Sequence, residues 1–260
     1  MSLTATYSGA NGWLLTWASG RPGATDLRVL VDPWLSGPLV FPPGPWMLQG
    51  ELLQPMAPPG ALDLVLICQG LADHCHLPSL ALLPRDLPVV ASRSAASKVR
   101  QLGFEQVTAL RPGEQHRHGE LWITATAGAP VPQVENGYLL EHPAGSLYVE
   151  PHGFLPPDLP ARDLDAVITP VTDLGLPLAG ALVRGRQVLP ALLERFRPAT
   201  VLASSTGGDV RFSGLLAGLL RSEGTVAEAG ATVAQAENTR ARLIDPVPGI
   251  PYELPVRTLA

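Results

Sequence analysis

Three side chains that can bind a metal ion lie within four residues of one another: Asp73, His74 and His76. They follow residues 64–68, a continuous apolar run typical of a strand that is covered on both faces. Loops at the ends of such strands commonly carry functional side chains. Carboxylate and imidazole groups are ligands of zinc, iron and manganese. The sequence therefore predicts a metal site in the loop of residues 69–76.

The same residues also have structural interpretations, and the sequence leaves both kinds open. An aspartate at a strand-to-helix turn, such as Asp73, often accepts hydrogen bonds from the backbone amides of its own loop. His76 precedes Leu77 and Pro78, so it can cap a short helix predicted for residues 77–83. Under this interpretation the loop keeps these side chains for folding and binds no metal.

The two cysteines of the chain, Cys68 and Cys75, both lie beside this predicted site. Two cysteines are too few for a disulfide framework, which favours a reducing, cytoplasmic compartment. We interpret Cys68 as a small core side chain at the end of the strand. A thiolate at Cys75 would bind zinc well, and the pair suggests redox sensing as a further alternative.

Two other polar segments could bind a ligand. His116 and His118 lie in residues 114–119, which we interpret as a polar turn; their spacing suits a metal, although solvated histidines are common in turns. Residues 204–209 follow a predicted strand, and their amides and hydroxyl groups could hold an anion such as phosphate. The simpler interpretation of residues 204–209 is the N-terminal cap of a following helix.

Short apolar runs separated by proline and glycine predict many short elements joined by turns. The predicted strands are residues 12–17, 27–32, 64–68, 88–91, 107–110, 121–125, 137–141, 146–150, 164–169 and 200–203. The predicted helices are residues 77–83, 92–102, 189–196 and 212–220. Residues 39–59 contain six prolines and are predicted to form an ordered surface loop. Strands in both halves with helices between them predict two sheets covered by helices.

The composition excludes several classes of function. With 46% hydrophobic and 16% charged residues, a chain of 260 residues can bury a substantial core and is not intrinsically disordered. The net charge of −5, with Lys98 as the single lysine, argues against a nucleic-acid partner. No apolar run approaches the roughly 18 residues of a membrane span, and the first seven residues lack a signal-peptide pattern. We therefore expect a cytoplasmic protein with no membrane partner.

Taken in order, several segments resemble the metallo-β-lactamase superfamily. Asp32-Pro33-Trp34 resembles an early turn of that family, and Ala72-Asp73-His74 after its strand resembles the family's metal motif. Residues 120–125 and 165–170 resemble two later strands. The resemblance covers nearly the full length and implies an α/β fold, a four-layer αββα sandwich, in a single domain of residues 1–260. Residues 69–76 and 148–152 resemble segments of the ascorbate-phosphate-lactonase-like branch, including its cyanobacterial and plastid group.

The resemblance also implies which metal ligands are present and which are absent. The family's HxHxDH motif falls on Gln69, Leu71, Asp73 and His74, so its first two histidines are missing. The family's bridging aspartate falls on His152. The histidines that the family places near residues 128–132 and 204–208 have no counterpart. The motif is therefore degenerate, and the two-metal centre of the family is not expected.

The remaining side chains could hold one divalent ion. They are Asp73, His74 and His152, with Glu150 or His76 within reach. Such an ion, zinc or else iron or manganese, would acidify a water molecule that Asp73 orients or deprotonates. We therefore expect a hydrolase of a small substrate such as a phosphorylated compound, an ester or a lactone. The alternative is a catalytically inactive member of the fold that binds a ligand or acts as a scaffold.

Overall fold

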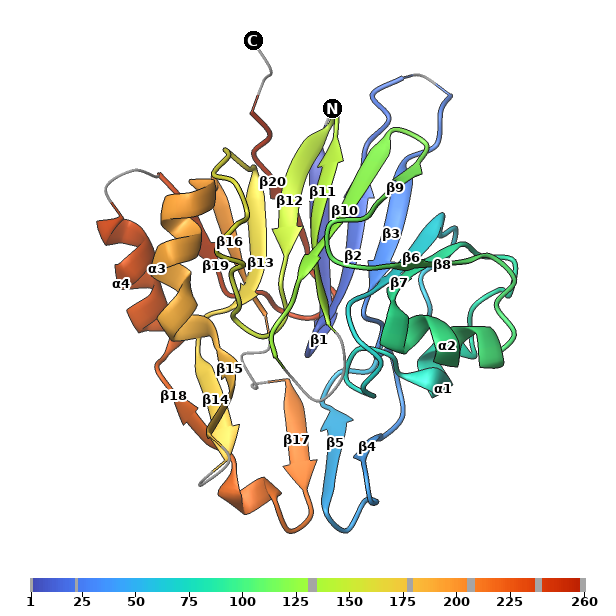
Figure 1. The fold of residues 1–260 in the computed structure, drawn as a ribbon, viewed down its shortest axis with the longest axis vertical. Helices are drawn as coiled ribbons and strands as arrows, with labels where there is room; N and C mark the ends of the chain where they lie inside the picture. The colour runs from blue at the N-terminus through green and yellow to red at the C-terminus, as the bar shows by residue number, and fades with distance from the viewer. Residues whose placement is uncertain are drawn as a thin grey trace.

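Two seven-stranded sheets lie face to face at the centre of the computed structural model, which describes residues 2–21, 23–130, 135–176, 180–204, 209–236 and 240–257 (Figure 1). The strand order of the first sheet is β20 (Pro251–Leu254), β1 (Leu3–Gly9), β2 (Gly12–Trp17), β3 (Leu27–Val31), β6 (Leu64–Ile67), β7 (Val89–Ser92) and β8 (Val107–Leu110). The order of the second is β19 (Arg242–Ile244), β16 (Thr200–Ser204), β13 (Ala166–Pro170), β12 (Gly145–Val149), β11 (Asn136–His142), β10 (Leu121–Ala127) and β9 (Gln115–His118).

Helices cover the outer face of each sheet. Helices α1 (Leu77–Leu80) and α2 (Arg93–Gln101) pack on the first sheet, where Val99 of α2 joins Val65 of β6 in one apolar cluster. Helices α3 (Gly185–Phe196) and α4 (Val226–Gln235) pack on the second sheet, where Leu193 and Val233 contact Val201 of β16. The four layers confirm the predicted αββα sandwich (Figure 1).

The main core lies between the two sheets. Trp13, Leu15 and Trp17 of β2 are fully buried and alternate with partly exposed residues, as expected for a strand with one face toward a core. They share one apolar cluster with Leu140 of the second sheet. The indole N–H of Trp17 donates a hydrogen bond of 2.9 Å to the carbonyl oxygen of Gly145, which joins the two sheets directly.

The first sheet brings distant parts of the chain together. Strand β1 is antiparallel to β2 on one side and to β20 on the other, where Leu3 pairs with Leu254 and Thr6 with Pro251. Strand β6 lies deeper in the sheet, parallel to β3 and β7, and is buried along its whole length. The predicted buried strand before the ligand loop is therefore confirmed.

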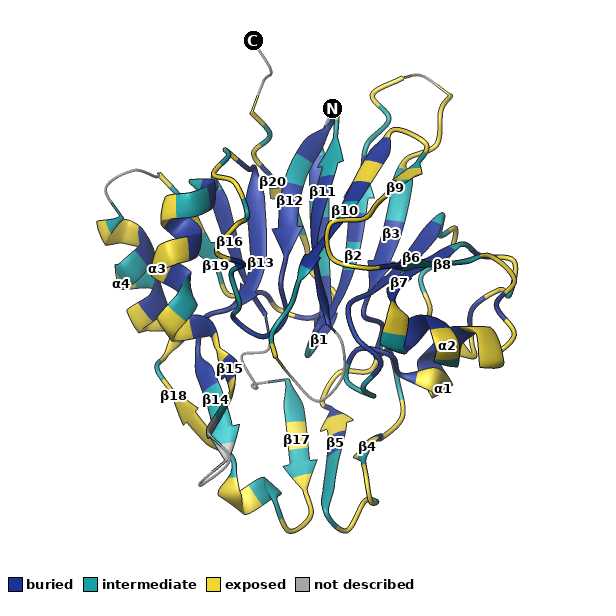
Figure 2. Ribbon diagram, in the orientation of Figure 1, coloured by how far each residue is buried: buried dark blue, intermediate teal, exposed yellow. Residues whose placement is uncertain are grey.

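Two small sheets extend beyond one end of the sandwich, at the bottom of Figure 1. One contains β15 (Gly180–Arg184), β14 (Asp173–Leu176) and β18 (Arg221–Glu223). The other contains β17 (Val210–Ser213), β5 (Leu48–Leu52) and β4 (Leu39–Phe41), and the 3₁₀ helix η1 (Ala217–Leu219) follows β17. Figure 2 shows that these sheets are more exposed than the buried central strands.

Three predictions about local structure are wrong. Residues 39–59 are not a loop throughout, because they contain β4 and β5. Residues 114–119 are not a turn throughout, because Gln115–His118 forms β9, which pairs with β10. Residues 212–220 do not form a helix: β17 pairs with β5, and Gly214, at φ +100°, turns the chain before η1. A Cβ at Gly214 would lie 2.7 Å from the carbonyl oxygen of Met47, so the turn needs glycine.

Two helices also begin or end elsewhere than predicted. Helix α3 begins at Gly185, which leaves Pro190 inside the helix rather than in its first turn. Its start is fixed by tertiary packing, because Gly185 lies against the backbone of Pro170 too closely for any Cβ. Helix α1 ends at Leu80 instead of residue 83. Of the predicted polar loop at residues 204–209, residues 205–208 lie outside the described residues.

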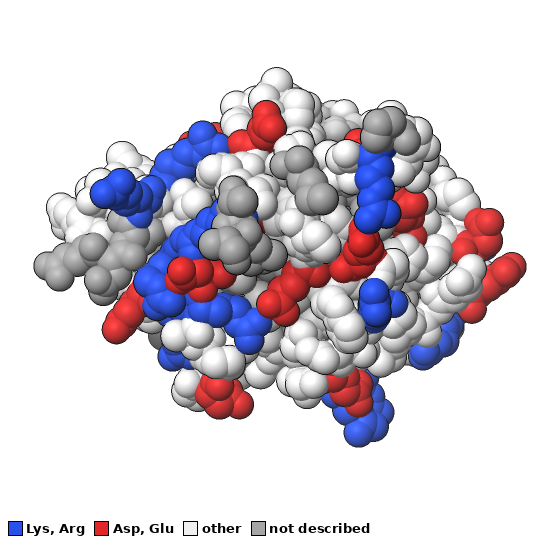
Figure 3. Space-filling model, turned by 90° about the horizontal axis from the view of Figure 1, so that it is seen from above, with Lys and Arg blue, Asp and Glu red and all other residues white. Residues whose placement is uncertain are grey.

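Charged side chains do not form a field of one sign on the face seen from above. Figure 3 shows basic and acidic side chains intermingled there. Arg197 and Arg257 both lie within 3.0 Å of carboxylate oxygens of Asp163, and Arg162 is 3.0 Å from Glu141.

Candidate metal centre

The predicted ligand loop begins where β6 ends. The backbone N–H of Cys68 donates a hydrogen bond of 2.7 Å to Oδ1 of Asp32, the residue that follows β3. The chain then turns, and the N–H of His74 donates to the carbonyl oxygen of Leu71 at 3.1 Å. This turn places Asp73 and His74 at the end of the first sheet.

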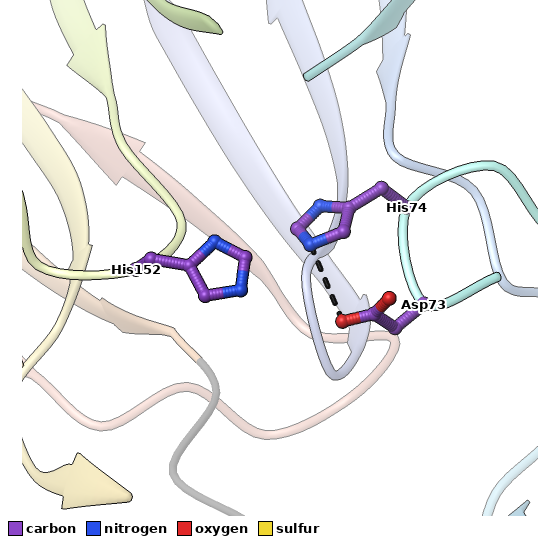
Figure 4. A group of neighbouring side chains, drawn as sticks. All are labelled: Asp73, His74 and His152. Carbon is purple, nitrogen blue, oxygen red and sulfur yellow. Dashed lines mark ion pairs between the residues drawn. The ribbon is translucent and has the colours of Figure 1, made fainter. Parts of the chain in front are cut away.

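Three of the predicted ligands converge on one point. One donor atom from each of Asp73, His74 and His152 lies within 4.8 Å of the other two. The Nε2 atom of His74 is 3.3 Å from Oδ2 of Asp73, and the ring centroids of the two histidines are 5.0 Å apart. Figure 4 shows the two rings approaching from opposite sides, with the carboxylate beside them. The loop after β6 and the loop after β12 therefore supply one cluster.

A buried aspartate fixes the orientation of His74. The Oδ2 atom of Asp32 is 2.8 Å from Nδ1 of His74, and both side chains are almost fully buried. Burial lowers the pKa of His74, but the carboxylates of Asp73 and Asp32 outweigh burial and raise this pKa well above its ordinary value. With Nδ1 donating to Asp32, Nε2 carries the lone pair that a metal could accept. Nε2 lies 3.3 Å from the amide nitrogen of Asn11.

A buried glutamate lies against His152. Oε2 of Glu135 forms an ion pair with Nδ1 of His152. Glu135 is held in turn by the side-chain amide of Gln69, which donates to Oε2 at 2.7 Å, and by the N–H of Ala129, which donates to Oε1 at 2.9 Å. The Nε2 atom of His152 is thus left facing Asp73 (Figure 4).

Asp73 is ionised and incompletely bonded. Burial raises the pKa of its carboxyl group, but His74 and His152 outweigh burial and lower the pKa to about 2. Its Oδ1 atom is buried, and the described part of the chain gives it no hydrogen bond. A buried carboxylate oxygen without a donor is costly, so it indicates an absent partner.

The structure does not bring Glu150 into the cluster. Its Oε1 accepts a hydrogen bond of 2.9 Å from the N–H of His152, and its Oε2 accepts one of 2.6 Å from the N–H of Gly153. Burial and the neighbouring carboxylate of Glu135 raise the pKa of Glu150 to about 7. Glu150 shapes the backbone of the loop that carries His152.

His76 lies outside the cluster as well, and the structure shows the capping interpretation. It is the N-cap of α1, where its Nδ1 accepts a hydrogen bond from the N–H of Ser79 at 3.3 Å. Its Nε2 lies 3.2 Å from the carbonyl oxygen of Pro38. Both ring nitrogens are therefore engaged, and the ring has no nitrogen left for a metal.

The remaining candidates are separate from the cluster. Cys68 and Cys75 are free and buried, and burial raises the pKa of the Cys75 thiol to about 12, so neither a zinc thiolate nor a redox pair is favoured there. His116 and His118 lie on β9. Within the described ranges no third His, Cys, Asp or Glu joins them in a metal-binding group.

Sequence reasoning missed two residues of the site. Asp32 was noted only within the Asp-Pro-Trp turn, yet it orients His74; its backbone, at φ +42°, is in the left-handed region that an aspartate adopts uncommonly. Glu135 gave no signal, because its link to Gln69 spans 66 residues. A conserved pairing between these segments would be the only sequence signal.

The cluster lies at the wall of a cavity of about 340 Å³. Asp73 and His152 line it, together with Asn11 from the turn between β1 and β2. Leu71, at a position where the family has a histidine, lines it too. The cavity is therefore in direct contact with the potential ligands, and its size falls within the usual range for small-molecule sites.

Residues 4–204 match the sequence model of the beta-lactamase superfamily domain. The chain belongs to this superfamily. The predicted resemblance is confirmed at that level and over that part of the chain. A search of curated proteins finds no match.

Several solved structures share the fold over most of this chain. An isothiocyanate hydrolase from Delia radicum gut bacteria is 15% identical, with a TM-score of 0.66, covering 96% of this chain and 98% of that one. A metallo hydrolase from Ignicoccus hospitalis is 14% identical, with a TM-score of 0.60 and coverage of 97% and 99%. The diiron beta-hydroxylase CmlA from Streptomyces venezuelae is 16% identical, with a TM-score of 0.62 and coverage of 97% and 54%. Likenesses at such identity establish the metallo-β-lactamase fold.

Among the helices described, none is long and apolar enough to cross a membrane.

Proposed function

We propose that this protein is a metal-dependent hydrolase that uses a single divalent ion held by Asp73, His74 and His152. The observation that carries the proposal is the convergence of three ligand atoms within 4.8 Å beside a cavity. One carboxylate and two imidazoles are a common ligand set for catalytic zinc, and three protein ligands leave a position open. Iron and manganese accept the same groups.

The side chains present fit such an ion. Asp32 and Glu135 engage the Nδ1 atoms of the two histidines, which leaves both Nε2 atoms for the metal. The unbonded Oδ1 of Asp73 would also gain a partner. The amide of Asn11, which lies 3.3 Å from Nε2 of His74, would have to move aside.

One ion accounts for the residues better than two. Gln69 stands where the family motif has its first histidine, and its amide is committed to Glu135. Leu71 stands at the second histidine position and offers no donor atom. These substitutions support the degenerate motif expected from the sequence. A standard two-metal mechanism is therefore not part of the proposal.

The protein residues then have distinct tasks in hydrolysis. When bound, the ion would supply positive charge that stabilises the developing oxyanion and acidifies water. Asp73, with a pKa of about 2, is a weak base at neutral pH, so it orients the attacking water rather than removing its proton. Asp32 and Glu135 keep the imidazole rings fixed.

A small ester or lactone is the proposed type of substrate. The segments at residues 69–76 and 148–152 support the lactonase-like branch of the superfamily. A phosphorylated substrate has less support, because the described residues lining the cavity include Asp73 and Asp209 but no lysine or arginine. The substrate carbonyl would then be the only strongly polar group to be recognised.

Metal content tests the proposal. Protein purified without a metal-affinity step should contain about one equivalent of zinc, iron or manganese, as three protein ligands and an open position require. The double variant Asp73→Ala, His74→Ala should lose this metal. His116→Ala, His118→Ala is the matched control, because it also removes two neighbouring potential ligands, and it should keep the metal.

A wild-type protein that binds no metal even in excess zinc would overturn the proposal. If the His116, His118 variant loses the metal instead, the protein binds a metal ion but at a different site from the one proposed. The hydrogen bond between Gln69 and Glu135, which fills the first metal position with protein groups, favours a second candidate function: a non-catalytic protein that binds a ligand in the cavity. Ligand binding without metal or turnover would support that candidate.

A further inference from the structure

The walls of the cavity beside the cluster are almost entirely apolar. The β4–β5 hairpin contributes Phe41 and Leu48, and the segment from β17 to η1 contributes Leu216. The hairpin of β14 and β15 contributes Leu174 and Leu182 from the other small sheet. Both small sheets in the lower part of Figure 1 therefore line the same cavity.

The polar groups of the cavity are few and mostly gathered at the metal cluster. Asp73 and His152 belong to that cluster, Asn11 lies beside it, and Asp209 lies next to β17. The described lining has no lysine or arginine that could pair with an anionic substrate. A cavity with reactive groups beside it and apolar walls binds a molecule with one polar group and an apolar remainder.

We propose that the substrate is a neutral ester or lactone carrying an unbranched apolar chain, which lies between the two small sheets while the carbonyl group faces Asp73 and His152. This inference deepens the proposed function and rests on it for the position of the carbonyl group. The position of the chain rests on the cavity walls alone. The two parts can therefore fail separately.

The hydrophobic effect gives the proposal a measurable signature. Each methylene buried from water contributes about 0.8 kcal/mol, which is about a fourfold gain in affinity. Primary alcohols from hexanol to decanol are suitable neutral probes, because they need no metal. Their affinity for metal-free protein, measured by calorimetry, should rise about fourfold for each added methylene.

Four leucines serve as test and control variants. Leu216 and Leu182 line the cavity; Leu216 is partly buried and Leu182 is 41% exposed. Leu219 and Leu82 do not line it and are 46% and 54% exposed. All four tolerate a charge because they are at least partly in water. Leu219 is also a close neighbour of Leu216. The Leu219 variant therefore distinguishes an effect on the cavity from an effect on the nearby surface.

Leu216→Asp and Leu182→Asp should each weaken decanol binding by about tenfold or more, because a carboxylate would have to be desolvated by the bound chain. Leu219→Asp and Leu82→Asp should change the affinity by less than about twofold. A thermal melt of each variant confirms that it is folded. If affinity does not depend on chain length, or if Leu219→Asp weakens binding as much as Leu216→Asp, the proposal is wrong.

Two further measurements separate this inference from the proposed function. The Asp73→Ala, His74→Ala variant should still bind decanol, since it keeps the apolar walls. Zinc-loaded wild-type protein should hydrolyse p-nitrophenyl esters with a kcat/KM that rises from acetate to decanoate, and Leu216→Asp should remove this trend. Alcohol binding without any hydrolysis would overturn the metal-dependent function and keep the apolar site. Hydrolysis without a chain-length trend would support the metal-dependent function and overturn the proposed site for the apolar chain.

Discussion

Each histidine of the candidate centre has a buried carboxylate on its Nδ1 atom: Asp32 on His74 and Glu135 on His152. Such partners fix the tautomer and the ring orientation of metal-binding histidines and increase their basicity. Neither carboxylate belongs to the three-residue cluster itself. The site therefore depends on the residue just after β3 and the residue just before β11.

Replacement of the first of these carboxylates should weaken metal binding. In Asp32→Asn, the NH₂ of the new amide would face either the N–H of Cys68 or Nδ1 of His74, and one of these two contacts with Asp32 would be lost. Zinc affinity should therefore fall by about 10- to 100-fold. Competition with a chromophoric chelator measures the zinc affinity. Asp63→Asn is the control, because Asp63 also accepts a backbone hydrogen bond, 2.8 Å from the N–H of Arg28, but lies away from the site. Equal affinity in both variants would contradict the role of Asp32.

The raised pKa of His74 predicts how metal binding depends on pH. Asp73 and Asp32, outweighing burial, keep this imidazole protonated at neutral pH in the metal-free protein, and a metal binds only the neutral form. Zinc binding should therefore release protons at pH 7, and affinity should fall as the pH is lowered. Calorimetry in two buffers of different ionisation enthalpy counts the protons. Binding with no proton release at pH 7 would contradict this assignment.

The same pKa shift has a consequence for the stability of the metal-free protein. Because the folded-state pKa of His74 is raised above its unfolded value, its contribution to stability is fully present below the unfolded pKa. The contribution is lost as the pH rises through the folded pKa. Glu150, with a pKa raised to about 7, acts in the same direction, so it adds to the loss of stability between about pH 4.5 and pH 7.

Among the elements, the turn between β17 and η1 restricts the residue type at one position, Gly214. Gly214→Ala should destabilise the fold by roughly 1–3 kcal/mol, because φ is +100° and the new Cβ would lie 2.7 Å from the carbonyl oxygen of Met47. Chemical denaturation measures the change in free energy of unfolding. Gly218→Ala is the matched control, since nothing lies within 4 Å of its added Cβ. It should change the stability by less than about 0.5 kcal/mol.

Local patterns predicted most central strands, but not β1, β9, β19 or β20, and they predicted no strand of the small sheets. The apolar run at Leu64–Ile67 and the alternating pattern at Gly12–Trp17 already indicate which residues are buried, without knowledge of distant contacts. Strands β4, β5 and β17 have only three to five residues each, and their pairing with each other is not visible locally. The apolar spacing at residues 212–220 fits a helix, but the contacts of β17 with β5 outweigh that preference.

The same limit explains which site residues were found. Asp73 and His74 are adjacent in the chain, so their spacing alone suggests a site. His152 was found through the family resemblance, since nothing in its own segment pairs it with Asp73. Asp32 and Glu135 act across 42 and 17 residues on His74 and His152, and a single sequence gives no measure of such contacts. The three-dimensional arrangement supplies them.

In the whole molecule, both halves of the chain contribute to one core between the sheets. Leu140→Ala should cost about 2–5 kcal/mol, because Leu140 is fully buried there. Unfolding followed by tryptophan fluorescence and by circular dichroism should still coincide in one transition, as expected for a single domain. Leu53→Ala, at a residue that is 50% exposed, is the control and should cost less than about 0.5 kcal/mol. Two separate transitions would contradict the single domain.

The pairing of β1 with β20 has a consequence for synthesis of the protein in the cell. Strand β1 leaves the ribosome long before β20, and its outer neighbour is complete only after residue 254 has been made. Until then the outer edge of β1 exposes unpaired backbone groups, which favour aggregation. The many contacts between distant residues also make folding slow. Nascent chains that stop before residue 251 should therefore depend on chaperones more than the finished protein does.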